Sequence, residues 1–292
     1  MIRMLVDSTC DLPREELALG DVGVIPLQVV LGDAAYRDGE TISVQDVYAA
    51  MREGILPKTA QPVPEDLITH FEDPCRQGQD VLYLSFSSAL SGTCNLARTL
   101  MQEVQQRYPR RRMAVVDSRS GSTAIGLMVR RARDLIRRGA TFDQTVAALE
   151  AMSRSVEHLF TIDDLRWLVA GGRLGRAQGA VGNLLSVKPL LQVRDGSIEL
   201  IGKTRGRTKA LRALVDLFEE RSRGVADPVV GISHADDPEA ARTLMNLIDE
   251  RTGPKEYVAS PIGSVLATHL GLGGVGVFFF NEDPDSTEMQ PV

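Results

Sequence analysis

Blocks of apolar residues follow one another along the first half of the chain, and they show two different periods. Continuous apolar runs bounded by polar residues are typical of strands buried in a parallel sheet, and they occur at residues 2–6, 24–31, 81–84 and 113–116. Apolar residues three and four positions apart predict helices at residues 44–51, 96–104, 124–138 and 142–156. This alternation of strand and helix predicts a doubly wound α/β fold with a parallel sheet.

The pattern changes after residue 156. Asp195 and Gly196 separate two apolar segments, at residues 188–193 and 198–201, and this arrangement is a strong signal for a β-hairpin. Further strands are predicted at residues 229–233, 257–259 and 275–280. A hairpin combined with helices indicates a mixed sheet of the α+β type.

We therefore expect an α/β protein of two domains, for which 292 residues are sufficient. Residues 1–156 are predicted to form an N-terminal three-layer α/β/α domain around a parallel sheet. Residues 157–283 are predicted to form a C-terminal two-layer α+β domain around a mixed sheet. The polar, acidic residues 284–292 are predicted to fray.

Composition narrows the class of protein. The net charge of −6 argues against a general nucleic-acid-binding role, and no apolar run is long enough to span a membrane. The three cysteines, Cys10, Cys75 and Cys94, are widely spaced and odd in number, which argues against a disulfide framework and against a zinc site. The four histidines lack the spacing of metal ligands. We expect a cytoplasmic protein with no metal site.

A hydroxyl-rich loop at residues 84–94 joins a predicted strand to a predicted helix. Ser91 is predicted to be the N-cap residue of that helix, Gly92 lets a ligand approach the backbone, and Thr93 adds a second hydroxyl. The unpaired N–H groups and the dipole of a helix N-terminus favour an anion. Ordinary helix capping is the simpler interpretation, and the local sequence leaves both open.

Three other polar residues are candidates for chemistry. Asp7 lies at the end of the first predicted strand. It is a candidate general base or, more simply, a carboxylate that braces a loop. Thr59 precedes Pro62 and Pro64 and is predicted in a rigid turn, where its hydroxyl either faces outward or bonds to its own backbone. His269 lies between small residues that leave room for a bulky group. Asp7, Ser91 and His269 form a catalytic triad on paper, but a Gly-x-Ser-x-Gly nucleophile elbow is absent.

Two basic segments occur in the second half. Arg173 lies in the Gly-rich turn at residues 171–175, and Lys203, Arg205 and Arg207 are predicted to share a loop before a helix. These residues are either a docking surface for an acidic partner or solvated charges.

Six of these stretches, taken in order, resemble the motifs of the DegV family. The resemblance depends on their shared order and spacing and covers almost the whole chain; the stretches lie at residues 7–12, 58–62, 87–93, 116–118, 171–174 and 268–271. The second stretch and the residue after it depart from the family pattern, because Ala60 and Val63 replace two hydroxyl residues.

The resemblance implies a protein that holds one long-chain, palmitate-like fatty acid between its domains, with the tail in a tunnel and no other cofactor. By the same resemblance, Ser91 and His269 look like the carboxylate ligands, and Thr59 looks like their supporting hydroxyl. The N–H groups at Gly92 and Thr93 match a helix N-terminus that attracts the carboxylate. Arg173 is a candidate for polar support of the carboxylate or for contact with a partner protein. The same two roles are open to Arg205 in the basic segment.

Some members of the family are carrier subunits of a bacterial fatty-acid kinase. They present the carboxylate to an ATP-using kinase subunit, which makes acyl phosphate for phospholipid synthesis. The resemblance thus implies a lipid-binding carrier that is not itself an enzyme. The alternative is a small-molecule hydrolase or transferase with Ser91 as its nucleophile.

Overall fold

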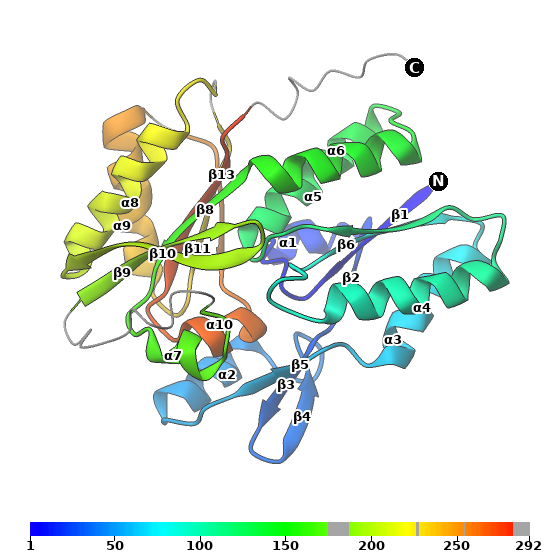
Figure 1. Ribbon diagram of the computed structural model, residues 1–292, viewed down its shortest axis with the longest axis horizontal. Coiled ribbons are helices and arrows are strands. Elements are labelled where there is room, and N and C mark those ends of the chain that lie inside the picture. Colours follow the sequence, from blue (N-terminus) through cyan, green and yellow to red (C-terminus); the bar gives the residue numbers. More distant parts are fainter. Residues whose placement is uncertain (175–186, 226–227, 254, 283–292) are drawn as a thin grey trace.

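Three β-sheets organise the computed structural model, which describes residues 1–174, 187–225, 228–253 and 255–282 (Figure 1). The first sheet is parallel, and its strands in spatial order are β2 (Val22–Ile25), β1 (Ile2–Asp7), β6 (Asp80–Ser85) and β7 (Met113–Asp117). Val81, Leu82, Tyr83 and Leu84 of β6 are all fully buried. This strand is apolar on both faces because helices cover both sides of the sheet.

The two helical layers of the parallel sheet have separate cores. On one face, side chains of β1 and β6 pack against α3 (Pro64–Arg76) and α4 (Thr93–Arg107). On the other face, alternate side chains of the same strands pack against α5 (Thr123–Arg137) and α6 (Phe142–Ser155). The short helix α1 (Arg14–Leu17) follows β1. The predicted three-layer α/β/α arrangement is confirmed.

The second sheet is mixed. Its strands in spatial order are β10 (Ser197–Arg205), β9 (Val187–Arg194), β8 (Val156–Thr161), β13 (Val275–Phe280), β11 (Val230–His234) and β12 (Tyr257–Pro261). Among the described strand pairs of this sheet, only β11–β12 is parallel. The turn between β9 and β10 has positive φ at Asp195 (48°) and Gly196 (78°), as a tight hairpin requires. The predicted hairpin and the predicted mixed sheet are both confirmed.

Helix α5 connects the two large sheets. It packs on β1 and β6 with one side and contacts β8, β11, β12 and β13 with the other. The opposite face of the mixed sheet is covered by α8 (Arg207–Arg221) and α9 (Pro238–Thr252). The predicted domain boundary falls where α6 ends and β8 begins. A division of the chain into two separate domains at that point stays a prediction.

A third, small sheet was only partly anticipated. Residues 24–31 were predicted as one strand, but Pro26 and Leu27 interrupt it, so that β2 stays in the parallel sheet and β3 (Gln28–Leu31) leaves it. β3 pairs with β4 (Ala34–Arg37) and β5 (Lys58–Ala60). This sheet lies at the bottom of Figure 1, near three helices: α2 (Val44–Arg52), α7 (Arg166–Ala170) and α10 (Ser264–Leu270).

The basic segment before α8 also differs from its prediction. Lys203 and Arg205 belong to the edge strand β10, and Gly206, with φ of 87°, makes the turn into α8. The loop prediction for residues 203–207 is therefore wrong, because strand pairing with β9 extends to Arg205. The predicted tail at 284–292 lies outside the described residues.

Candidate functional site

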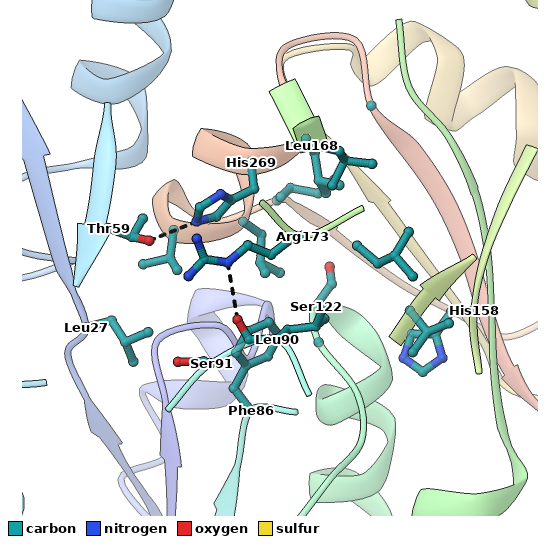
Figure 2. A pocket seen from close by; sticks show the side chains of 18 of the residues that line it. Leu27, Thr59, Phe86, Leu90, Ser91, Ser122, His158, Leu168, Arg173 and His269 are labelled. Carbon is teal, nitrogen blue, oxygen red and sulfur yellow. Dashed lines mark hydrogen bonds between the residues drawn. The ribbon is translucent and has the colours of Figure 1, made fainter. Parts of the chain in front are cut away.

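A cavity of about 530 Å³ lies between the loops after β6 and β7, strands β5, β8 and β13, and helix α10. Its volume is within the range of roughly 300–1,000 Å³ that is usual for small-molecule sites. Most of its wall is apolar and includes Phe86, Leu90, Phe160, Ile162, Leu168, Ile198, Val265, Leu266 and Phe278. Figure 2 shows that Thr59, Ser91, Arg173 and His269 gather on one side of it.

The loop after β6 contributes Ser91 and Gly92 to this polar side. The N-cap residue of α4 is Gly92, so the prediction of Ser91 as the N-cap residue is wrong by one position. Ser91 Oγ still caps the first turn, because it accepts a hydrogen bond of 3.2 Å from the Thr93 N–H. Thr93 is fully buried, and its Oγ1 lies 2.9 Å from Ser91 Oγ. Thr93 thus holds Ser91 in place through these hydrogen bonds and does not itself line the cavity.

Thr59 reaches the cavity from β5. The prediction that Thr59 lies in a rigid turn is wrong, because residues 58–60 pair with β3 and form a strand. The irregular segment follows at residues 61–63, before α3. Thr59 Oγ1 lies 2.8 Å from Nε2 of His269 on α10, and a dashed line marks this bond in Figure 2. The structure therefore brings together two candidate residues that are 210 positions apart.

The His269 ring is neutral at pH 7. Burial and, after it, the charge of Arg173 lower the pKa of His269 from 6.5 to about 4. Its Nδ1 is buried and has no hydrogen-bond partner among the described residues. Because unpaired buried N–H groups are rarer than unpaired acceptors, we assign the ring hydrogen to Nε2, which donates it to Thr59. The Thr59 hydroxyl hydrogen is then available to a ligand.

Arg173 supplies positive charge to the same side of the cavity. Its guanidinium donates to two backbone carbonyls, Leu90 at 3.2 Å and Gly171 at 2.5 Å, which fix its position. No described carboxylate lies within ion-pair distance of Arg173, although the side chain is half-buried. A guanidinium has five N–H donors, so it has donors left for an anion. Arg205, in contrast, is exposed on β10 and does not line the cavity.

Asp7, Ser91 and His269 do not form a catalytic triad in the structure. Ser91 Oγ bonds to Thr93, and the His269 ring bonds to Thr59. Asp7 is fully buried and accepts hydrogen bonds from Thr9, Tyr83 and the Phe86 N–H. Asp7 therefore braces the loop after β6, and its candidacy as a general base is wrong.

Sequence reasoning missed several polar residues of the cavity wall, among them Ser122 and His158. Ser122 has a positive φ of 60°, and its hydroxyl donates to Asp11 at 2.6 Å, a carboxyl whose pKa burial raises to about 8. His158 lies on β8 and is almost fully buried. In the sequence, His158 occupies one of the alternate positions that Val156, Phe160 and Ile162 otherwise fill with apolar side chains. This pattern could have drawn attention to His158, but it does not reveal which face of the strand borders a cavity.

Within the described parts of the chain, no cluster of histidine, cysteine and carboxylate side chains could hold a metal ion. The search of the same residues for helices found none with the length and apolarity needed to cross a membrane.

Fold and site together define an α/β protein with a largely apolar cavity whose charge and hydroxyls lie at one side. The family model described as "Uncharacterised protein, DegV family" matches residues 1–282. A fatty acid-binding protein of Thermotoga maritima is 34% identical over 282 residues, which cover 94% of this chain and 96% of the relative. The chain belongs to the DegV family.

Two solved structures have the same fold. A DegV family protein from Thermus thermophilus, described with fatty acid binding, has a TM-score of 0.88 and 33% identity, with 96% of this chain and 99% of that chain covered. A stearic acid-binding protein from Eubacterium ventriosum has a TM-score of 0.89 and 29% identity, with the same shares covered. The family contains fatty-acid-binding proteins, and the predicted resemblance is confirmed.

Proposed function

We propose that this protein binds one long-chain fatty acid in the cavity, with the carboxylate at the side formed by Thr59, Ser91, Gly92, Arg173 and His269. The observation that carries the proposal is Arg173, a half-buried cation that faces an apolar cavity without a described carboxylate partner. A half-buried cation has lost part of its hydration and is stabilised by a counter-ion, so the site favours an anion. A fatty acid supplies that anion together with an apolar chain.

The hydroxyls and the helix N-terminus complement the same ligand. Thr59 has a hydroxyl hydrogen to donate, and Ser91 has one when Thr93 Oγ1 is the donor between the Ser91 and Thr93 hydroxyls. A carboxylate accepts several such hydrogen bonds. Burial of the alkyl chain contributes about 0.8 kcal/mol per CH₂ before ordering costs. The fatty acids named for the solved relatives from Thermus thermophilus and Eubacterium ventriosum support this ligand class.

We further propose that the protein is a carrier that presents the carboxylate to a fatty-acid kinase subunit. Gly92 and Gln61 line the cavity and are also exposed, so the polar side of the cavity lies near the molecular surface. His158, in contrast, is buried. A carboxylate at the polar side would thus be near solvent while the tail stays covered. The unassembled triad gives no support to a hydrolase or transferase with Ser91 as its nucleophile.

The direct test is denaturing extraction of the purified protein with organic solvent, followed by mass spectrometry. We expect about one fatty acid per chain. Protein that carries no lipid and fails to bind added palmitic or stearic acid would refute the fatty-acid proposal. Transfer of phosphate from ATP to the bound acid by a bacterial fatty-acid kinase subunit tests the carrier role separately.

A further inference from the structure

His158 is a polar residue in the apolar part of the cavity. It lies on β8, and the exposed fraction of the residue is 3%. Phe278 of β13 meets its ring edge-on, with 5.6 Å between ring centroids and an interplanar angle of 87°. Figure 2 shows His158 across the cavity from Thr59, Arg173 and His269. If the carboxylate lies beside Arg173, the group that faces His158 belongs to the tail of the fatty acid.

The His158 ring lacks the hydrogen bonds that a buried imidazole needs. Neither Nδ1 nor Nε2 has a hydrogen-bond partner among the described residues. Burial lowers the pKa of His158 to about 4, against a smaller opposing effect of the Val156 backbone, so the ring is neutral at pH 7. A neutral imidazole has one donor and one acceptor nitrogen. The Val156 carbonyl can only accept, so the acceptor nitrogen stays unpaired in either tautomer.

Buried polar groups in native proteins are nearly always hydrogen-bonded, and an unpaired one is costly. A saturated alkyl tail offers neither a donor nor an acceptor to His158. A double bond offers no donor. A hydroxyl group has a hydrogen to donate, so it can pair with the acceptor nitrogen of the neutral ring, which neither an alkyl chain nor a double bond can do.

We propose that His158 selects fatty acids that carry a hydroxyl group on the chain, at the position that meets the ring when the carboxylate occupies the polar side. This inference rests on the proposed fatty-acid-binding function and narrows its ligand class to hydroxylated long-chain acids. A site that bonds to a ligand hydroxyl discriminates against the analogue without it, because the protein group is then left unpaired.

The test compares stearic acid with a series of hydroxystearic acids in which the hydroxyl moves along the chain. Dissociation constants are measured for delipidated wild-type protein and for three variants. His158→Leu removes the hydrogen bonds at similar size, and His158→Gln restores a donor and an acceptor. Phe160→Leu is the matched control, because it alters the same wall two residues along β8 without a polar group.

We expect at least one isomer to bind wild-type protein about three- to ten-fold more tightly than stearic acid. His158→Leu should abolish that ratio while it binds stearic acid at least as well, His158→Gln should retain part of it, and Phe160→Leu should keep it. The absence of any preferred isomer in wild-type protein would overturn the inference, and so would a preference that survives in His158→Leu. A wild-type protein that fails to bind stearic acid and every hydroxystearic acid would overturn the proposed function itself.

Discussion

Gly171 lies against the His269 ring, and a Cβ atom at residue 171 would overlap Nδ1 of His269. The bare backbone at Gly171 therefore allows His269 to reach Thr59. Gly171 has φ of −74°, which alanine adopts without strain, so any effect of a substitution comes from the ring contact.

Gly171→Ala should weaken fatty-acid binding about as much as His269→Ala does, because both changes remove the bond between His269 and Thr59. Titration of palmitic acid into delipidated protein measures the effect. Gly274→Ala is the control, since its added methyl group meets nothing closer than 3.6 Å. Equal affinity of Gly171→Ala and wild type would show that the position of His269 does not matter for binding.

Ser91→Ala should weaken fatty-acid binding about ten- to a hundred-fold, because a hydrogen bond to a charged group contributes about 1.5–3 kcal/mol. His269→Ala should have a similar effect through Thr59, because it removes the bond that leaves the Thr59 hydroxyl hydrogen to the carboxylate. If both residues serve one carboxylate, the double variant should lose less affinity than the sum of the two single losses. A double-mutant cycle of dissociation constants measures this coupling. Strict additivity would contradict a shared carboxylate.

Arg173→Met should distinguish recognition of the ligand's charged group from recognition of its alkyl chain. Affinity for palmitic acid should fall about ten- to a hundred-fold, whereas affinity for the alcohol of the same chain length should stay nearly the same, because the alcohol has no charge to lose. Arg166→Met, at an exposed position on α7, is the matched control. Equal losses for acid and alcohol would indicate that Arg173 contributes packing and not charge recognition.

His158 predicts a pH dependence of stability. Its pKa is about 4 in the folded protein and about 6.5 in the unfolded chain, so between these values the unfolded chain binds more protons. The free energy of unfolding should therefore fall, through this group, as the pH decreases from 6.5 to 4. The free energy of unfolding of His158→Leu minus that of wild type should therefore increase by about 3 kcal/mol as the pH falls across that window.

Urea denaturation of delipidated protein at several pH values measures this effect. Phe160→Leu has no titratable group at the changed position, so its stability difference from wild type should stay constant with pH. A constant difference for His158→Leu as well would show that His158 is protonated to the same extent in both states.

Arg205→Glu tests the proposed docking surface for a kinase subunit. Arg205 is exposed on the edge strand β10, whereas Arg207 pairs with Asp237 at 2.8 Å. Charge reversal at Arg205 should slow acyl phosphate formation at low salt and leave the dissociation constant for fatty acid unchanged. Arg212→Glu on α8 is the matched control. Unchanged kinetics for Arg205→Glu at low salt would remove Arg205 from the interface.

The parts of the fold that follow from local chemistry could be predicted from the sequence. Asp195 and Gly196 supply the positive φ values of a tight hairpin by themselves, and the buried strand at residues 80–85 is recognisable as an apolar run. Thr59 was placed wrongly because its strand exists only through pairing with β3, which is distant in the sequence. The local effect of Pro62 and Pro64 was correct but begins after that strand.

In the candidate site, too, some features follow from the local sequence and others depend on tertiary contacts. The motifs around Ser91 and His269 indicated an anion site, and both residues line one cavity. The bond between His269 and Thr59 and the absence of a described ion partner for Arg173 depend on tertiary contacts that no local pattern encodes. His158 was missed for the same reason, because the face of β8 that borders the cavity is decided by α5 and β13.

The position of α5 has a consequence for cooperativity. One core cluster contains Val6 and Leu84 of the parallel sheet, Met128 of α5, and Val258 and Phe278 of the mixed sheet. Cutting the chain at residue 156 would leave α5 with one apolar side facing water. In the intact chain, unfolding of either sheet would expose the apolar side of α5 that packs on it. The whole protein should therefore lose its structure in a single thermal transition.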